Sequence, residues 1–279
     1  MKSLSGADFA FLARLLRRRS GLFLTPEKLD LVERRLAPVT RRFGFKSAAS
    51  LVHELRHGRE ALAAAVTEAV TVNETSFFRD AKFFDRFTRE LLPGLLAQRG
   101  PRRRLRIWCA ACSTGQEAYS IAMVLDDLGL ATAGWSVDLI ATDLSREAVA
   151  RAEEGRYDAL EMARGLDQEQ RTRWFRQEGE HWTVAPHLRR MVDFRVFNLL
   201  DSYGWLDDLD FVFCRNVLLY FDRAARISVL ERMAETMADD GMLLLGDAET
   251  ADHGLLEALP GTDGVYVKAL PAAMRLAAR

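Results

Sequence analysis

The sequence predicts an α/β protein in which a small all-α domain precedes a larger domain built on a parallel sheet. Residues 4–70 repeat apolar side chains at helical spacing, whereas from about residue 104 short β-like runs alternate with helical segments. A hydrophobic content of 49% with 28% charged residues is typical of globular proteins, and 279 residues suffice for two unequal domains. We expect a helical domain over 1–72, a connector and helix over 73–100, and the α/β domain over 101–279.

The N-terminal domain is predicted to consist of several short helices. Ser5 is placed to cap the first one, whose apolar residues follow at spacings of three and four. Thr25 and Pro26 provide an N-cap and a proline at the first position of a second helix. Pro38 is expected to kink or shorten that helix, and further helix is predicted over 51–70.

The larger domain shows the alternation of strands and helices that a parallel sheet requires. An amphipathic helix over 82–100 comes first, and the closing VYVKAL, 265–270, fits a last, antiparallel strand. The predicted strands are 104–110, 136–142, 208–214 and 241–246, and the predicted helices are 116–129, 145–154 and 223–238.

Residues 157–198 are longer than an ordinary crossover between parallel strands. They contain a charged segment, 167–178, that reads as a helix, and two β-like pieces at 182–185 and 191–197. We therefore expect a small inserted β-subdomain at about 180–197.

The N-terminal segment is basic although the whole chain is nearly neutral. Residues 1–46 contain eleven Lys or Arg and four Asp or Glu, whereas the full chain has a net charge of −1. A basic module attracts polyanions, so the expected partners are nucleic acid, an anionic membrane surface or an acidic protein face.

Cysteine content and hydropathy favour a cytoplasmic protein. Three cysteines, an odd number, argue against a disulfide framework and fit a reducing compartment. No apolar run approaches the ~20 residues that cross a bilayer, and the N-terminus lacks the basic-then-apolar order of a signal peptide. We expect neither export nor membrane insertion.

The connector contains the segment TVNETSFFRD, residues 71–80. Asn73, Thr75 and Arg79 are hydrogen-bonding side chains close to the apolar pair Phe77-Phe78. A simple linker needs no such density of polar groups beside buried rings. The pattern indicates a strip that lies across a ligand pocket and is anchored by its two Phe rings.

A tight turn follows the first predicted strand. Ser113-Thr114-Gly115 brings backbone N–H groups and a helix N-terminus together, as the first βα turn of a nucleotide site does, although one glycine does not make a GxGxxG motif. Glu117, in the first turn of the following helix, either stabilises the helix dipole or binds a cation.

Polar residues also end the next two strands of this pattern. Asp143 stands where doubly wound folds bond ribose hydroxyls, or it caps the next helix. Arg215 and Asn216 end a buried strand, with Tyr220 one turn further on, where such folds bind substrate.

Two further motifs have alternative interpretations. HELRH, 53–57, matches the HExxH zinc motif, but no third ligand is near it and chance occurrence on a solvated helix is the favoured interpretation. Cys109 and Cys112 have CxxC spacing, with only Cys214 besides them and no neighbouring His. The thiols are expected to line the first strand and its turn, and the alternative is a redox role. We predict no metal site.

The ordered set TVNETSFFRD, AACSTGQEAYS, ATD, FNLL and FCRNVLLYF resembles the CheR-type chemotaxis receptor methyltransferases over nearly the whole chain. The resemblance implies a Rossmann-like, S-adenosylmethionine-dependent methyltransferase domain with a small inserted β-subdomain, behind an all-α domain. It also implies methyl transfer to glutamate side chains of chemoreceptors, which yields glutamyl methyl esters for chemotactic adaptation and S-adenosylhomocysteine as product.

The same resemblance assigns roles to individual residues. Glu117 would meet the methionyl end of the cofactor, Asp143 the ribose, and Asn198 and Leu199 the adenine region. Arg79 and Tyr220 match family positions close to the methyl group and are the predicted catalytic residues. The full predicted cofactor set is Asn73, Thr75, Arg79, Glu117, Asp143, Asn198, Leu199, Arg215 and Asn216.

This chemistry requires no general base. A glutamate with a pKa near ~4.3 is already ionised at neutral pH, so the absence of an obvious His–carboxylate pair is expected. We expect Arg79 to orient the incoming carboxylate and Tyr220 to shape the site near the sulfonium.

The basic second helix then acquires a rationale. Receptor methylation helices are rich in Glu, and an arginine face would align them; the alternative is a solvated surface helix. The predicted docking residues are Arg34, Arg35, Arg41 and Arg42.

Some residues depart from the family pattern. Gln116 and Ala118 stand where many relatives have Glu and Pro, and GDAET, 246–250, replaces a GHSE-like run, which makes that loop doubtful as a functional element. Only Gly179-Glu180 and His181 lie between the charged segment and Trp182, whereas relatives that bind a receptor's C-terminal pentapeptide have a longer, glycine-rich loop. We therefore expect no dependence on such a tether.

Two other functions are compatible with parts of the sequence. A non-catalytic protein of the same fold would sense the cofactor or dock on receptors, but the pocket residues are present as a set. A nucleic-acid methyltransferase would suit the basic N-terminus, but the chain lacks an NPPY- or PC-type motif and an aromatic stacking platform. We therefore predict no nucleic-acid partner.

Overall fold

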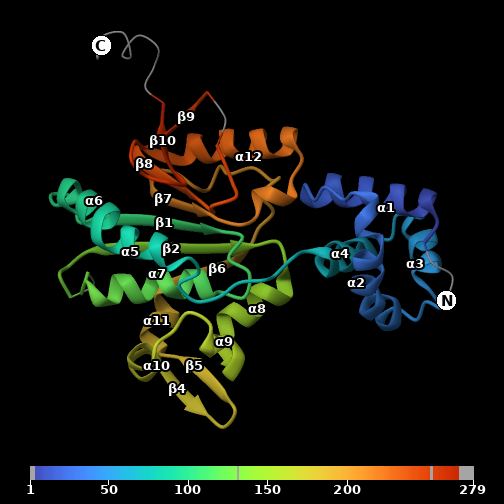
Figure 1. Ribbon diagram of the computed structural model, residues 1–279, viewed down its shortest axis with the longest axis horizontal. Coiled ribbons are helices and arrows are strands. Elements are labelled where there is room, and N and C mark those ends of the chain that lie inside the picture. The colour runs from blue at the N-terminus through green and yellow to red at the C-terminus, as the bar shows by residue number, and fades with distance from the viewer. Residues whose placement is uncertain (1–3, 131, 252–253, 270–279) are drawn as a thin grey trace.

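A computed structural model describes residues 4–130, 132–251 and 254–269 as a helical domain beside an α/β domain (Figure 1). The helical domain contains α1 Gly6–Ser20, the 3-10 turn η1 Pro26–Lys28, α2 Leu29–Arg42, α3 Ala48–Leu55 and α4 Glu60–Val70. The rest of the chain contains, in order, α5 Ala81–Arg86, the π-helical turn η2 Phe87–Leu91, α6 Leu92–Arg99, β1 Arg104–Ala110, α7 Gln116–Asp127, β2 Ser136–Asp143, α8 Arg146–Glu154, β3 Arg156–Asp158, α9 Ala159–Ala163, α10 Gln168–Trp174, β4 Phe175–Glu178, β5 His181–Val184, α11 Pro186–Met191, β6 Val192–Val196, β7 Leu209–Cys214, the 3-10 turn η3 Leu218–Tyr220, α12 Arg223–Thr236, β8 Met237–Leu245, β9 Leu256–Ala258 and β10 Val265–Lys268.

The helical domain begins and turns where its sequence signals predict. The Ser5 hydroxyl accepts a hydrogen bond from the backbone N–H of Asp8 and caps α1, which ends at Gly21 in a left-handed conformation. Pro26 opens the turn that leads directly into α2. That helix continues through Pro38 to Arg42, so the expectation of a shortened helix is wrong.

The α/β domain is built on one seven-stranded sheet. Its strand order is β6-β2-β1-β7-β8-β10-β9, in which β10 pairs antiparallel with both β8 and β9 and all the other pairs are parallel. This is the mostly parallel, Rossmann-like α/β fold that the sequence predicts. The antiparallel last strand is also confirmed, although Leu270, the final residue of VYVKAL, lies outside the described residues.

Strand periodicity sorts the buried side chains onto the two faces of the sheet. In β1, Ile107 and Cys109 face the core beneath α5–α7, whereas Trp108 and Ala110 face the core beneath α12. Figure 1 shows α7 and α12 on opposite faces. Because both faces are covered, the central strands are apolar along most of their length.

The inserted subdomain differs from its expected boundaries. It is a three-stranded antiparallel sheet of order β3-β5-β4, and β4 occupies the last four residues of the segment predicted as a helix over 167–178. The piece predicted at 191–197 forms β6, which pairs with β2 in the main sheet. Short, exposed strands such as Phe175–Glu178 carry no clear period in the sequence, and their pairing with β5 across a two-residue turn decides their structure.

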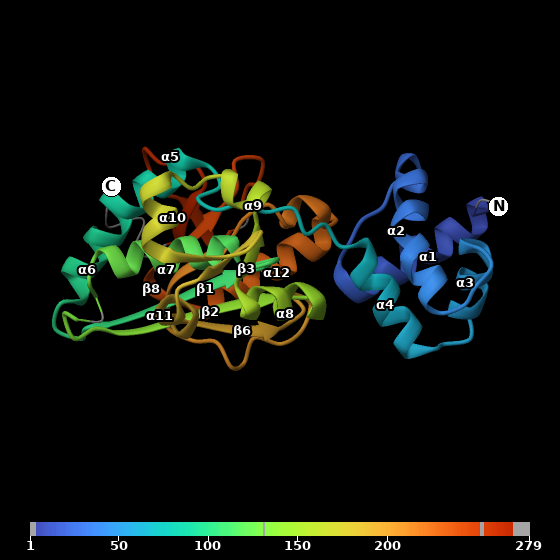
Figure 2. The ribbon, with the colours of Figure 1, turned by 90° about the horizontal axis from the view of Figure 1, so that it is seen from below.

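The two domains are joined by the 71–80 segment and by direct contacts (Figure 2). Arg17 pairs with Asp222 at the start of α12, and Glu68 of α4 accepts hydrogen bonds from the Ser145 hydroxyl and the Glu147 backbone at the start of α8. Within 4–130, 132–251 and 254–269, no helix has the length and apolar character needed to span a bilayer.

Candidate active site

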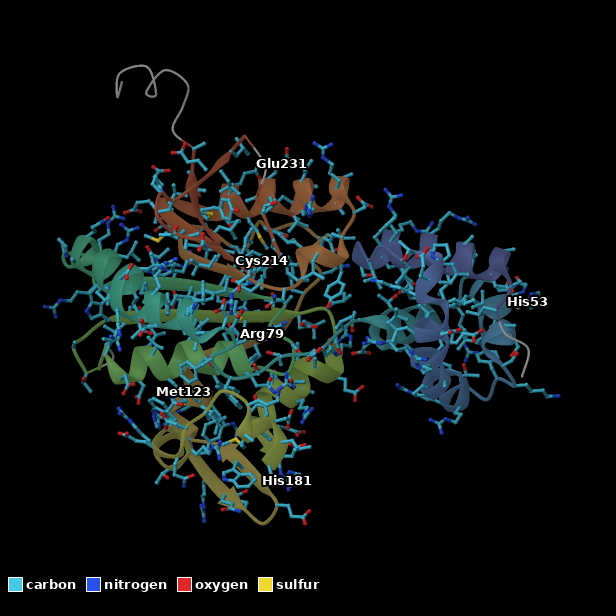
Figure 3. All side chains as sticks on the ribbon, viewed as in Figure 1. His53, Arg79, Met123, His181, Cys214 and Glu231 are labelled. Atoms are coloured by element: carbon cyan, nitrogen blue, oxygen red, sulfur yellow. The ribbon has the colours of Figure 1, made fainter. Side chains whose placement is uncertain are left out.

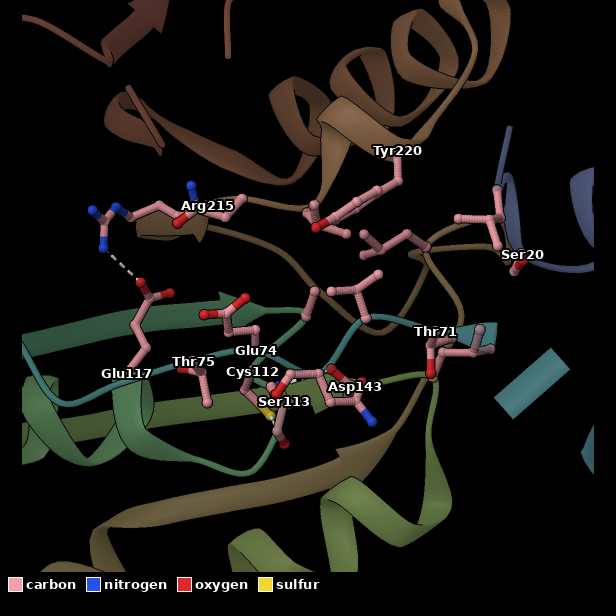
Figure 4. Close-up of a pocket in the computed structure, with 18 of the residues that line it drawn as sticks. Ser20, Thr71, Glu74, Thr75, Cys112, Ser113, Glu117, Asp143, Arg215 and Tyr220 are labelled. Carbon is pink, nitrogen blue, oxygen red and sulfur yellow. Dashed lines mark hydrogen bonds and ion pairs between the residues drawn. The ribbon is translucent and has the colours of Figure 1, made fainter. Parts of the chain in front are cut away.

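A cavity lies between the domains, beyond the carboxyl ends of β1, β2 and β7 (Figure 4). The cavity is open to solvent on one side, and polar side chains from both domains line it. All residues predicted for the cofactor or for catalysis line it: Asn73, Thr75, Arg79, Glu117, Asp143, Asn198, Leu199, Arg215, Asn216 and Tyr220. Ser20, Leu22 and Thr71 add a wall from the helical side.

The 71–80 segment crosses this cavity and is anchored at both ends of its polar part. Phe77 is fully buried and meets the rings of Tyr157 and Phe175 edge to face, with centroids 5.0 and 5.4 Å away. The backbone N–H of Phe78 donates to the Ser120 hydroxyl at 2.9 Å. The Ser113 hydroxyl donates to the carbonyl of Asn73 at 3.0 Å, which ties the segment to the turn after β1.

The turn after β1 is compact because backbone and side chains approach it closely. Ser113 and Gly115 have φ values of 52° and 94°. A Cβ atom on Gly115 would lie 2.9 Å from that of Ala152, so only glycine fits there. The fold thus brings the N-terminus of α7 next to the cavity.

Glu117 and Arg215 form a buried ion pair at one end of the cavity. Arg215 Nη1 donates to Glu117 Oε2 at 2.8 Å, and the other carboxylate oxygen accepts from the Cys109 thiol at 3.4 Å. The guanidinium carbon lies 4.0 Å from the ring centroid of Phe83, and Arg215 Nε is buried with no hydrogen-bond partner in the described part of the chain. The carboxylate is therefore held in place, with one face toward the cavity.

Asp143 lies at the end of β2 and is tied to the backbone. Its two oxygens accept from the N–H groups of Ser113 at 2.8 Å and Ser145 at 2.9 Å. Ser145, and not Asp143, caps α8 through the Ala148 N–H, so the helix-cap alternative does not describe this carboxylate. Burial raises the pKa of Asp143, and the two N–H bonds oppose that rise.

Asn198 joins the cavity to the helical domain. Its side-chain N–H donates to the carbonyl of Arg19 at 2.6 Å, while its side-chain oxygen accepts from the Leu200 N–H at 3.0 Å. The predicted adenine-side wall is thus attached to the C-terminal end of α1.

Sequence reasoning missed Glu249, in the 246–250 loop that looked doubtful. The residue is 4% exposed, and its carboxylate accepts five backbone N–H bonds, from Asn216, Val217, Leu218, Leu219 and Gly246, at 2.6 to 3.3 Å. A Cβ on Gly246 would lie 2.7 Å from Asn216 Nδ2. GDAET keeps the first and fourth residues of the GHSE-like run, and that match was the available signal.

The four arginines predicted for docking lie outside the cavity, on α2. Arg34, Arg41 and Arg42 are exposed. Arg35 is half-buried, and its Nη1 donates to the carbonyls of Val70 and Thr71. Arg35 thus differs from the expectation: it supports the end of α4, and the exposed basic face contains the other three.

The HELRH motif lies far from the cavity (Figure 3), and the cysteines of the CxxC motif are buried. His53, on α3, meets the ring of His57 edge to face, and His53 lies far from Arg79 (Figure 3). The described segments contain no group of three or more His, Cys, Asp or Glu that could hold a metal. Cys109, Cys112 and Cys214 are free and buried, and burial raises the pKa of each thiol, which keeps them protonated.

Comparison with known proteins agrees with this geometry. Residues 7–71 match the model of the CheR methyltransferase all-alpha domain, and residues 73–262 match that of the CheR methyltransferase SAM-binding domain. Chemotaxis protein methyltransferase 1 of Pseudomonas aeruginosa is 40% identical over 90% of this chain and 93% of its own. Chemotaxis protein methyltransferase Cher2 of Pseudomonas putida is 39% identical over 88% of this chain and 91% of its own, and the chemotaxis protein methyltransferase of Escherichia coli is 36% identical over 90% and 87%. The chain belongs to the CheR methyltransferase family.

Proposed function

We propose that this S-adenosylmethionine-dependent methyltransferase esterifies glutamate side chains on the cytoplasmic helices of chemoreceptors. The main support is that the ten residues predicted for the cofactor or for catalysis all line one interdomain cavity in a chain of this family. The three relatives compared above are named as chemotaxis methyltransferases, which supports the pathway. The proposal locates the enzyme in the cytoplasm, where those receptor helices lie.

The residues around the cavity fit the cofactor. The free face of Glu117 suits an ammonium group, and Asp143 retains lone pairs for ribose hydroxyls because each oxygen accepts only one backbone bond. Asn198 and Leu199 would flank the adenine, and the remaining predicted residues would complete the walls. When bound, S-adenosylmethionine supplies a methyl group activated by a sulfonium.

The protein's own contribution is position and exclusion of water. The acceptor glutamate is ionised at neutral pH, so no residue has to remove a proton. Arg79, whose guanidinium is held by the carbonyl of Glu74 at 3.1 Å, would orient the carboxylate, and Tyr220 would shape the wall opposite. Because this reaction neutralises charge, covering the site with the helical domain favours it.

Substrate selection would use the exposed arginines of α2. Their charge suits helices rich in glutamate. The two-residue turn between β4 and β5 offers little surface for a pentapeptide, so we propose that methylation does not depend on a receptor tether. A receptor fragment without its C-terminus should then be methylated as well as the full one.

The deciding experiment follows the chemistry of the product. The protein is incubated with methyl-labelled cofactor and a receptor cytoplasmic fragment, and the product is treated with mild alkali. Release of labelled methanol is expected, because carboxyl methyl esters hydrolyse readily. Alkali-stable label would assign a different acceptor, and cofactor binding without labelling of any receptor fragment would favour a non-catalytic sensor.

Arg79→Ala tests the proposed orienting role in the same assay. A loss of turnover with retained folding is expected, whereas Arg89→Ala, which changes an exposed arginine paired with Asp85, should behave as wild type. Normal turnover of folded Arg79→Ala would contradict the role.

A further inference from the structure

A short stretch after α1 pairs with the loop that bears Tyr220. Leu22 and Phe221 form an antiparallel bridge, and the Phe23 N–H donates to the Tyr220 carbonyl at 2.8 Å. Gly21 favours this approach, because its φ of 74° is one that side chains rarely adopt and a Cβ there would lie 3.3 Å from the Phe221 ring. The Tyr220 wall of the cavity is therefore built by both domains.

Two large apolar side chains are exposed beside this pairing. Phe23 is 50% exposed and Leu219 44% exposed, whereas their neighbours Leu22 and Leu218 are buried. Single exposed apolar residues are common on protein surfaces. These two come from different domains, yet both adjoin Tyr220, and Leu22 and Tyr220 line the cavity.

A lysine side chain also lies beside Tyr220. The ammonium of Lys28, an exposed residue, lies 6.0 Å from the centre of the Tyr220 ring. The neighbouring Glu27 carboxylate is engaged by the Thr25 hydroxyl, which lowers its pKa. Apolar and cationic groups thus meet at the edge of the cavity.

We propose that Phe23, Lys28 and Leu219 form the substrate entrance and receive one amphipathic receptor helix. This inference rests on the proposed function. On a helix, a glutamate and an apolar residue three or four positions away share one face. Lys28 would attract the acceptor carboxylate toward Tyr220, while Phe23 and Leu219 would cover the apolar neighbours. The entrance would thereby determine which glutamate of the receptor helix reaches the site, whereas the α2 arginines would attract the receptor helix along its length.

The double variant Phe23→Ala/Leu219→Ala tests the apolar part. Loss of two interface anchors is expected to raise KM for the receptor fragment about tenfold, which corresponds to ~1.4 kcal/mol, with kcat and cofactor affinity unchanged. Leu128→Ala is the matched control: Leu128 is 40% exposed but follows α7, at the opposite end of the sheet.

Lys28→Glu tests the charged part. It should also raise KM, and its effect should shrink at high salt because exposed charges are screened. The effect of the apolar double variant should persist at high salt. The same Lys28 result at all salt concentrations would contradict a steering role.

The outcomes separate the entrance from the proposed function. If the wild type forms no alkali-labile ester, the proposed function fails and the entrance with it. If the wild type forms the ester and the double variant keeps the wild-type KM, only the entrance is wrong. An equal loss in Leu128→Ala, or a parallel loss of cofactor affinity, would also overturn it, because the effect would then not be specific to the receptor.

Discussion

Backbone N–H groups hold two of the buried carboxylates around the cavity. Asp143 accepts two such bonds and Glu249 five, whereas Glu117 is paired with Arg215. N–H groups in loops must be satisfied when they are buried, and a carboxylate can accept several at once. Each acid therefore fixes the conformation of the loop around it as well as its own position.

Glu249→Gln should loosen the wall that contains Asn216 and Tyr220. An amide has one acceptor oxygen, and its NH2 would face N–H donors that the carboxylate now satisfies. We expect a loss of about 1–3 kcal/mol in the free energy of unfolding, together with weaker cofactor binding. Denaturant unfolding and calorimetric titration measure the two effects.

The control for this variant is Glu257→Gln, on an exposed position of β9. It should change neither quantity. Wild-type stability and affinity in Glu249→Gln would show that the five bonds to the loop contribute little.

The raised pKa of Asp143 predicts how cofactor affinity depends on pH. An ionised carboxylate accepts ribose hydroxyls, so affinity should fall as the pH falls through a value above the ordinary ~3.9 of aspartate. For folding the sign is opposite: because the folded pKa is raised, Asp143 contributes least at neutral pH and its contribution improves as the pH falls. Titrations of cofactor at several pH values, with Asp143→Asn for comparison, test this. An unchanged pH profile in the variant would assign the titration to another group.

At the level of elements, the sequence predicts the long buried parts best. The strand expected at 104–110 matches β1 Arg104–Ala110, because both faces of that strand are covered and its apolar run is continuous. The expected helix over 223–238 similarly contains α12 Arg223–Thr236. The errors fall on β4 and β6, a short exposed strand and an edge strand whose pairing is decided by tertiary contacts.

In the site, too, residues in local sequence patterns were predictable, whereas residues that act through tertiary contacts were not. Asn73, Asp143 and Arg215 were identifiable because polar residues at strand ends or beside buried rings form a local pattern. Four of the five backbone groups that bind Glu249, and both carbonyls that bind Arg35, lie 30 or more positions away in the sequence. Apart from the Gly246 and Glu249 positions of the GHSE-like run, sequence spacing carries no trace of these bonds. Phe23 was equally hidden, since its exposure depends on how the two domains meet.

The helical domain also caps the N-terminus of α8, the helix that follows Asp143. Glu68 accepts from the Glu147 N–H at 2.8 Å and the Ser145 hydroxyl at 2.9 Å. Glu68→Ala removes a capping carboxylate, which is expected to cost ~0.5–2 kcal/mol. Faster amide hydrogen exchange at the start of α8 would reveal it. Glu54→Ala, a change on α3, should leave that exchange unaltered, and equal rates in both variants would contradict the capping role.

For the whole molecule, the cavity belongs to neither domain alone. The helical domain supplies Ser20, Leu22 and Thr71, and the carbonyl of Arg19 holds Asn198. The domain that carries the basic surface therefore also closes the cofactor site. A change in how the two domains are arranged would therefore affect both the receptor-attracting surface and the cavity.

The basic surface of the helical domain includes the exposed residues Arg34, Arg41 and Arg42 of α2. Charge reversal, Arg34→Glu, should raise KM for the receptor fragment without changing cofactor affinity, because these side chains lie outside the cavity. The difference from wild type should be largest at low salt and shrink when the Debye length falls to about 8 Å at physiological ionic strength. Arg102→Glu makes the same charge change before β1, at the opposite end of the sheet, and should have a much smaller effect. Equal effects of the two reversals would mean that net charge, rather than the α2 face, governs receptor binding.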